Sequence, residues 1–219
     1  HPLTRAVGFT GSFRGGKALF DLAMSRPEPI PFFGELGAIN PVFVLPAAQS
    51  ARAGDLGTAW AGSLTMGVGQ FCTNPGVVIL QDDADADSFV EAARSALSAV
   101  QAQPMLTAGT AEGYRKGVSS LSSAKGTQAH LDPSAEGRNA APALFEVAGS
   151  DWLADPDLAQ EVFGPSGIVV RASDAEQMLD IARNLHGQLT ATLQMDEGDT
   201  DAARPLVPVL ERKAGRVLV

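Results

Sequence analysis

The stretch VVILQ at residues 77–81 decides the fold of this chain. It is a short apolar run that begins after Gly76 and ends before Asp82, and helical patterns flank it at 54–68 and 87–101. Apolar runs bounded by Gly, Pro or Asp that alternate with helices are typical of a layered α/β fold. The alternation therefore predicts a mainly parallel sheet with flanking helices.

The same alternation continues in both directions along the chain. We expect strands at 6–9, 32–35, 41–45, 77–81, 144–148, 167–171, 189–194 and 215–219. We expect helices at 16–25, 54–68, 87–101, 108–123, 175–184 and 200–211. Asp174 and Asp199 stand at two of the helix starts, where free N–H groups and the helix dipole favour a carboxylate. Residues 123–142, rich in Gly, Ser and Ala, are predicted to be an exposed connection.

Composition excludes several classes of protein. With 219 residues, 45% of them hydrophobic, the chain can bury the core of one domain and part of another. The net charge of −9 and the absence of any Lys/Arg run longer than Arg212-Lys213 argue against nucleic acid and anionic membranes as partners. Its apolar stretches are too short to span a bilayer. A single cysteine cannot form an internal disulfide, which fits a reducing compartment, so we expect a cytoplasmic protein. We expect no metal site.

Both ends of the sequence resemble interrupted strands. The chain enters a strand pattern at 6–9 and stops inside another at 216–219. Because a strand needs neighbours to satisfy its backbone groups, we expect this chain to be a piece of a longer protein. Near the first end, Pro27, Pro29 and Pro31 form a stiff linker that is predicted to end the first helix and direct the next strand.

Two segments could carry chemistry at a turn. In FTGSFRGGK, residues 9–17, Gly11 and Ser12 lie between a strand and a helix, where a phosphate could meet backbone N–H groups, although such a turn alone more often serves only as a turn. Cys72 lies in the irregular stretch GQFCTNPG, residues 69–76, where a side chain can face a cleft, although cysteine is also common as a small buried residue. No histidine is near Cys72 in sequence, so a Cys-His protease dyad is unsupported.

Two glutamates are candidates for acid and base roles. Glu35 lies in FFGELGA, residues 32–38, where burial of the anion would cost free energy and would favour a role in proton transfer. The alternative is a strand-end glutamate that reaches solvent. Glu161 lies in EVFGP, residues 161–165, where the plain interpretation is a helix-ending acid before a Gly-Pro turn.

Together and in this order, the segments resemble the aldehyde dehydrogenase superfamily over essentially the whole chain. FTGS at 9–12 looks like its phosphate-side turn, ELGA at 35–38 like its general-base motif ELGG, GQFCT at 69–73 like its nucleophile motif, and EVFGP at 161–165 like its EIFGP motif. The resemblance implies that residues 1–38 are the C-terminal remnant of a dinucleotide-binding domain and that residues 39–219 are the catalytic domain.

The resemblance also implies site roles and a mechanism. Cys72 would be the nucleophile and Glu35 the base, and the cofactor, NAD or NADP, would meet Gly11, Ser12, Leu36, Gly37, Glu161 and Phe163. Cys72 would attack an aldehyde, hydride would pass to the nicotinamide, and Glu35 would activate water to hydrolyse the thioester. Ala38 replaces the second glycine of ELGG, and the family's oxyanion-hole asparagine and adenosine-side lysine precede His1. We therefore expect the chain alone to be inactive.

The motifs look most like those of bacterial α-ketoglutarate semialdehyde dehydrogenases. The alternatives are an NADP-linked medium- or long-chain aliphatic aldehyde dehydrogenase, a CoA-acylating aldehyde dehydrogenase, which typically lacks the base at Glu35, and a non-catalytic structural fragment. Arg14 or Arg115 could meet a substrate carboxylate, although surface ion pairing is the plainer role for each. The family resemblance implies a small-molecule aldehyde as partner and a homo-oligomeric parent protein.

Overall fold

A computed structural model describes residues 1–132 and 136–219. The chain divides into two compact units, His1–Ala38 and Ile39–Val219, and each is considered by itself.

The first unit is a strand, a helix and a parallel strand. These are β1 (Val7–Gly11), α1 (Phe13–Met24) and β2 (Phe32–Leu36), and the strands pair in parallel. Ser12 caps α1, because its side chain accepts a hydrogen bond from the Gly15 backbone N–H at 3.2 Å. The helix ends before the three prolines, as predicted.

This small unit leaves much of its apolar surface uncovered. The side chains of Phe13, Leu22 and Phe33 are 68%, 66% and 69% exposed. Exposed large apolar side chains such as these are often found where other protein packs. The unit buries Ala23 and Ile30 but leaves these larger side chains uncovered.

The second unit is built on a seven-stranded sheet in the order β11-β10-β3-β4-β9-β8-β6. Every neighbouring pair is parallel except β6 and β8, which are antiparallel. The mainly parallel α/β fold predicted from the sequence is confirmed. The strands are β3 (Val42–Val44), β4 (Val77–Gln81), β6 (Gln128–Leu131), β8 (Ala143–Ala148), β9 (Ser166–Ala172), β10 (Gln188–Gln194) and β11 (Ala214–Leu218), and a small antiparallel pair is formed by β5 (Gln103–Pro104) and β7 (Asn139–Ala140).

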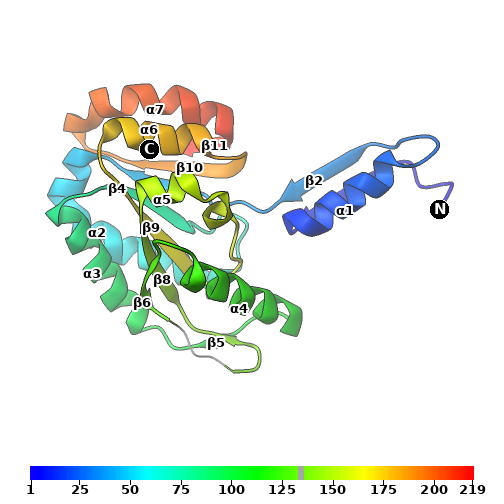
Figure 1. Ribbon diagram of the computed structural model, residues 1–219, viewed down its shortest axis with the longest axis horizontal. Helices are drawn as coiled ribbons and strands as arrows, with labels where there is room; N and C mark the ends of the chain where they lie inside the picture. The colour runs from blue at the N-terminus through cyan, green and yellow to red at the C-terminus, as the bar shows by residue number, and fades with distance from the viewer. Residues whose placement is uncertain (133–135) are drawn as a thin grey trace. The chain divides into compact units, whose positions relative to one another are not determined.

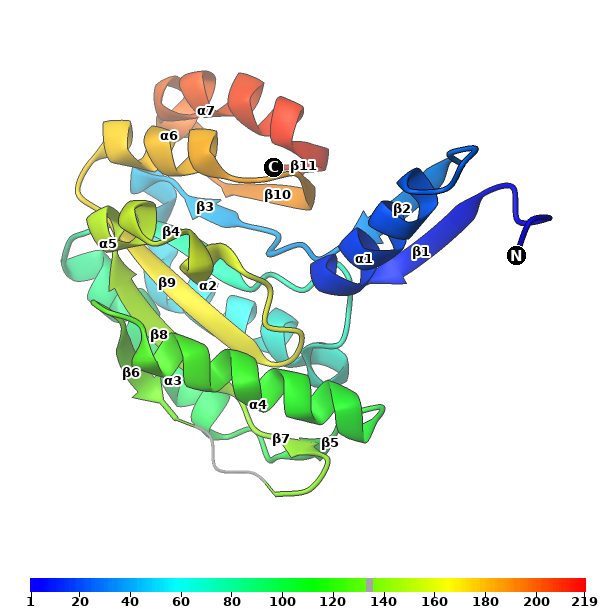
Figure 2. The ribbon, with the colours of Figure 1, turned by 45° about the vertical axis from the view of Figure 1, so that its right-hand side comes forward.

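Helices cover both faces of this sheet (Figures 1 and 2). Val78 and Leu80 of β4 pack with α2 and α3, whereas Val77 and Ile79 pack on the other face with α4 to α7. All four side chains are at most 2% exposed, so the apolar run 77–81 is buried on both faces, as a central parallel strand requires. The helices are α2 (Pro46–Thr65), α3 (Ala84–Ser98), α4 (Ala108–Ser123), α5 (Gly149–Ala154), α6 (Ala175–Asn184) and α7 (Thr200–Lys213), with short 3-10 turns η1 (Met66–Gly69), η2 (Pro156–Ala159) and η3 (Glu197–Asp199).

The predicted start of α2 was wrong by eight residues, and those of α1 and α3 were each wrong by three. Helix α2 begins at Pro46 instead of residue 54. The backbone angles of Arg52 are not helical, so the helical spacing of apolar residues is interrupted there and does not reveal the first turns. The carboxylate of Asp199 accepts hydrogen bonds from the N–H groups of Ala47 at 2.7 Å and Ala48 at 2.9 Å. Asp199 therefore caps α2 through a distant contact, whereas Asp174 caps its own helix α6 as predicted.

The expectation of an exposed connection at 123–142 was also wrong, because this segment contains β6 and β7. A partly buried charge cluster holds β6 to the sheet: His130 lies 3.0 Å and Arg171 lies 2.9 Å from the carboxylate of Glu146. Burial opposes the charge on Arg171, but hydrogen bonds to Asp87 and Glu146 outweigh it and raise the pKa of the guanidinium. Composition could not reveal these partners, which lie on other strands and on α3. Residues 133–135 of the predicted connection lie outside the described residues.

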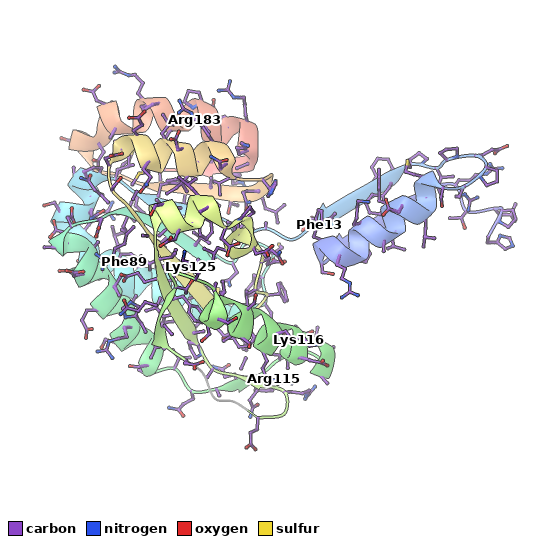
Figure 3. The ribbon with its side chains drawn as sticks, viewed as in Figure 1. Phe13, Phe89, Arg115, Lys116, Lys125 and Arg183 are labelled. Carbon is purple, nitrogen blue, oxygen red and sulfur yellow. The ribbon has the colours of Figure 1, made fainter. Side chains whose placement is uncertain are left out.

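Helices α2 and α3 pack closely at a glycine. The rings of Trp60 and Phe89 lie 5.8 Å apart, and Phe89 is labelled in Figure 3. A Cβ added at Gly57 would collide with the backbone carbonyl of Phe89. Gly62, in the same helix, is exposed and has no atom within 4 Å of such a Cβ.

We expect Gly57→Ala and Gly62→Ala to change stability in opposite directions. Gly57→Ala forces two backbones apart and should lower the free energy of unfolding by about 1–3 kcal/mol. Gly62→Ala should raise it by about 0.5–1 kcal/mol, because alanine loses less backbone entropy in a helix than glycine does. Urea unfolding of both variants measures the difference. Equal midpoints would show that the close helix contact at Gly57 does not exist.

Candidate active site

The candidate site residues of the second unit lie at the amino-terminal edge of its sheet. Residues 69–76 directly precede β4, residues 161–165 precede β9, and residues 39–41 precede β3. These strands are neighbours and parallel, in the order β3-β4-β9, so the segments that enter them meet at one edge. The sheet thereby gathers segments that are far apart in the sequence.

Cys72 is exposed in a turn between η1 and β4, as expected of a reactive side chain and not of a packed cysteine. The chain approaches this turn through three consecutive residues with left-handed backbone, Gly67, Val68 and Gly69, at φ of 56°, 59° and 63°. Glycine adopts this conformation readily, but a β-branched valine does so at a cost in free energy. Strained backbone of this kind clusters at functional sites.

The turn of Cys72 contacts the EVFGP segment directly. The side-chain amide of Asn74 donates a hydrogen bond to the Gly164 carbonyl at 3.1 Å. A Cβ added at Gly69 would collide with the backbone of Gly164 and would lie 2.6 Å from the nitrogen of Pro165. Two motifs that are about ninety residues apart in the sequence are therefore joined in one unit.

Within that segment, Glu161 and Phe163 differ in exposure. Glu161 is partly buried in the loop that follows η2, and Phe163 is 38% exposed. Glu161 therefore does not end an α-helix, which was the plain interpretation of its position. An aromatic ring that remains partly exposed next to a segment that contacts the Cys72 turn is available to a ligand.

The first unit carries the other predicted residues. Gly11 and Leu36 are register partners in the β1-β2 pair, as are Thr10 and Glu35. Gly11 and Ser12 form an exposed turn that leads into the N-terminus of α1, so its first N–H groups fit an anion such as a pyrophosphate. The side chain of Leu36 packs on Gly16.

The sequence left two environments open for Glu35, and the structure shows the solvent-exposed one. Glu35 is exposed on β2, and Gly34 and Phe33 beside it are also exposed. The helix of this unit packs on Leu36 and does not cover the carboxylate, so burial within the unit does not support a role for Glu35 in proton transfer. Glu35 and Leu36 of the ELGA motif lie on β2, and Gly37 follows the strand directly.

Sequence reasoning gave no role to Asn40, whose side chain bridges the Cys72 turn and β10. Its amide donates to the carbonyls of Cys72 at 2.9 Å and Asn74 at 3.0 Å, and accepts from Thr190. No local pattern could have identified these partners, because they lie 32 to 150 residues away.

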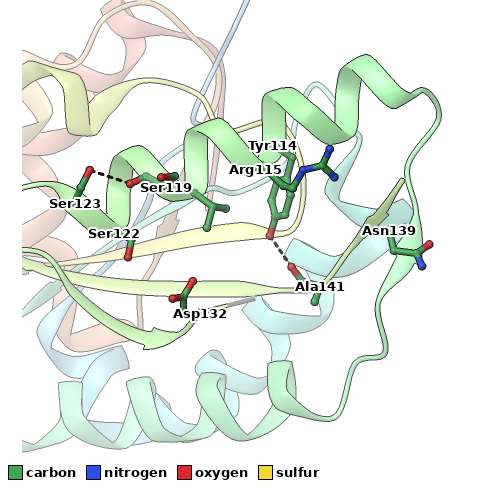
Figure 4. Close-up of a pocket in the computed structure, with 9 residues that line it drawn as sticks. Tyr114, Arg115, Ser119, Ser122, Ser123, Asp132, Asn139 and Ala141 are labelled. Atoms are coloured by element: carbon green, nitrogen blue, oxygen red, sulfur yellow. Dashed lines mark hydrogen bonds between the residues drawn. The ribbon is translucent and has the colours of Figure 1, made fainter. Parts of the chain in front are cut away.

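A cavity of about 380 Å³ lies beside α4, and none of its lining residues belongs to the predicted catalytic or cofactor set (Figure 4). It includes Arg115, whose guanidinium donates to the Gly137 carbonyl at 2.6 Å instead of forming the expected surface ion pair. The hydroxyl of Tyr114 is also engaged, by the Ala141 carbonyl at 2.6 Å, and burial raises the pKa of this phenol. The side chains of Tyr114 and Arg115 thus join α4 to the segment that contains Gly137 and Ala141.

Two further findings concern other classes of site. In the part of the chain that the structure describes, no helix is both long enough and apolar enough to cross a membrane. Among residues 1–132 and 136–219, no three His, Cys, Asp or Glu side chains gather as a metal ion would require.

A parallel α/β sheet whose amino edge presents an exposed cysteine, next to a glutamate- and phenylalanine-bearing loop, defines the class of protein. The chain belongs to the aldehyde dehydrogenase family, whose sequence model matches residues 1–200, and the resemblance seen in the motifs is confirmed.

Two relatives align with this chain along its whole length. The chain is 47% identical over 226 residues to alpha-ketoglutaric semialdehyde dehydrogenase 2 of Azospirillum brasilense, and 42% identical over 221 residues to alpha-ketoglutaric semialdehyde dehydrogenase of Acinetobacter baylyi. Each match covers all of this chain and 42% of the relative, so the chain spans less than half of their length.

Solved structures share the fold at lower identity. One is a glyceraldehyde-3-phosphate dehydrogenase from Methanocaldococcus jannaschii complexed with NADP, at a TM-score of 0.74 and 21% identity, with 98% of this chain and 45% of that chain covered.

Proposed function

We propose that this chain carries the nucleophile and the base of an NAD(P)-dependent aldehyde dehydrogenase that oxidises α-ketoglutarate semialdehyde to α-ketoglutarate. The observation that carries the proposal is the exposed Cys72 turn joined to the EVFGP segment at one sheet edge. The identity of 47% and 42% to two α-ketoglutaric semialdehyde dehydrogenases supports the substrate.

In this proposal the two units have separate tasks. Residues 1–38 are the last part of a dinucleotide-binding domain, and their strand-helix-strand form and exposed apolar side chains fit a piece of a larger sheet. Residues 39–219 are the catalytic domain. Gly11, Ser12, Leu36, Gly37, Glu161 and Phe163 would hold NAD or NADP, with Glu161 at the nicotinamide ribose and Phe163 against the cofactor or substrate wall.

The chain's own residues would act in three steps. The Cys72 thiolate attacks the aldehyde carbon to form a thiohemiacetal, and the Cys72 backbone N–H stabilises its oxyanion. When bound, the nicotinamide would supply the hydride acceptor that the thiohemiacetal needs to become a thioester on Cys72. Glu35 then removes a proton from the water that hydrolyses the thioester and releases the acid.

The rival within the family is a CoA-acylating enzyme, in which CoA and not water resolves the thioester. The presence of Glu35 in the ELGA motif favours hydrolysis. The family resemblance places the oxyanion-hole asparagine and the adenosine-side lysine outside this chain, so the proposal assigns turnover to the full-length protein that contains it.

Steady-state kinetics of the full-length protein test this function. We expect kcat/KM for α-ketoglutarate semialdehyde to exceed that for medium-chain aliphatic aldehydes with either NAD or NADP, and the addition of CoA to leave the acid as product. The 219-residue chain assayed beside it should form no NAD(P)H at a useful rate. A preference for aliphatic aldehydes, an acyl-CoA product or robust turnover by the chain alone would contradict the corresponding part of the proposal.

A further inference from the structure

Asn40 occupies an unusual position at the amino edge of the sheet. Its side chain is 2% exposed, and its backbone φ is +46°. Among the described residues, the non-glycine residues with positive φ are Asn40 and Val68, and both adjoin the Cys72 turn. Asparagine adopts positive φ more readily than most residues do. Strained backbone at a buried residue nevertheless calls for a functional explanation.

The side-chain amide of Asn40 uses its donors and its acceptor on different elements. Nδ2 donates to the Cys72 carbonyl at 2.9 Å and to the Asn74 carbonyl at 3.0 Å. Oδ1 accepts from the backbone N–H and the hydroxyl of Thr190, both at 3.2 Å. Carbonyls only accept and a backbone N–H only donates, so these partners determine which end of the amide is nitrogen.

The backbone of this segment is anchored as well. Oε1 of Gln188, the first residue of β10, accepts from the N–H groups of Ile39 at 2.8 Å and Asn40 at 3.0 Å. Asn40 is therefore fixed to β10 through its main chain and through its side-chain oxygen, and it presents a rigid pair of donors to the cysteine turn.

The opposite side of the turn is held by the EVFGP segment. Asn74 donates to Gly164, and Gly69 packs on the same backbone without room for a Cβ. The turn is thus held by Asn40 on the β3 and β10 side, by Gly164 on the β9 side, and by Trp60 of α2, whose Nε1–H donates to the Pro75 carbonyl at 2.8 Å. Loss of the Asn40 contact leaves the turn joined to the other two, so the fold can persist while the position of the thiol changes.

We propose that Asn40 is a positioning residue, which holds the Cys72 peptide in the place where the thiol can attack a bound aldehyde. This inference rests on the proposed role of Cys72 as nucleophile. Asn40 acts through the backbone of the turn and has no contact with the reacting atoms in this role. An apolar replacement would remove the amide donor from the Cys72 carbonyl, whereas the Asn74 carbonyl would keep its hydrogen bond from the Gly76 N–H at 2.9 Å.

Hydrogen exchange provides a test that does not depend on any substrate. The N–H groups of Asn74 and Gly76 are bonded to the carbonyls of Phe71 at 3.0 Å and Ile39 at 3.0 Å, so their exchange reports opening of the turn. We expect Asn40→Gly, which suits the positive φ and removes only the amide, to accelerate exchange at these two sites about tenfold or more. Thr190→Val, which removes one bond to Oδ1 and leaves both bonds to the turn, should accelerate it less.

The control variant is Gly57→Ala, which is expected to destabilise the contact between α2 and α3 and contains the complete Asn40 network. It should leave exchange at Asn74 and Gly76 at the wild-type rate relative to global unfolding.

In the full-length protein, Asn40→Gly should lower kcat about 100-fold with KM nearly unchanged, and alkylation of the exposed Cys72 by iodoacetamide should keep its wild-type rate.

Wild-type exchange at Asn74 and Gly76 in Asn40→Gly would overturn the inference, whatever the activity of the protein. So would an equal effect of Gly57→Ala on those two sites, because it would make the role of Asn40 one of general stability. An absence of aldehyde turnover in the wild-type full-length protein contradicts the proposed function instead, and leaves the exchange result to decide the role of Asn40.

Discussion

Cys72→Ala in the full-length protein is expected to lower kcat for aldehyde oxidation by on the order of 10⁴-fold or more, because it removes the thiolate that forms the covalent adduct. Cys72 is the single cysteine of this 219-residue chain. The side chain is exposed in a turn, and its removal should leave the urea unfolding midpoint and the affinity for the cofactor unchanged.

Alkylation of the thiol tests the same role of Cys72. Iodoacetamide should add one equivalent to the wild-type chain and none to Cys72→Ala, and the loss of activity in the full-length protein should follow the extent of addition at Cys72. Cys72→Ser keeps the shape of the side chain but supplies a much weaker nucleophile, so it should resemble the alanine variant. Appreciable oxidation by the alanine variant would remove Cys72 from the mechanism.

Glu35→Gln is expected to slow thioester hydrolysis by about 10²–10⁴-fold, the usual contribution of a positioned general base. Formation of the thioester does not need this base, so a rapid burst of one NAD(P)H per active site should remain. Single-turnover kinetics with the full-length protein separate the burst from the slow release of acid.

A matched control for this glutamate lies in the same unit. Glu28 is an exposed carboxylate, 3.8 Å from Arg5, and Glu28→Gln removes the same charge from the same part of the chain. It should change neither the burst nor the hydrolysis rate, since an exposed ion pair contributes little. A variant Glu35→Gln that loses the burst but still hydrolyses its thioester would reverse the assigned roles.

The environment of Glu35 could not be decided from its neighbours in sequence. The apolar residues in FFGELGA allowed either a covered carboxylate or one that reaches solvent, and the side chain is exposed. Apolar neighbours in sequence alternate between the two faces of a strand, so they do not by themselves enclose the residue between them.

For the segment around Cys72, the prediction from the sequence agreed with the structure. Glycines on both sides and Pro75 indicated an irregular connection, and the structure has an exposed turn at that place. Local backbone chemistry determines whether a regular element can form, so this part of the prediction needed no partner.

The sequence by itself determined the parallel α/β architecture and the irregular turn that carries the cysteine, because hydrophobic periodicity and turn residues act over a few neighbouring positions. Only the tertiary structure decided that Asp199 caps α2, that β6 joins the sheet, and that Asn40 ties the cysteine turn to β10. These contacts join residues that strand order alone brings together. A hydrogen bond depends on the positions of both partners, and nothing in the sequence near one partner records the identity of the other.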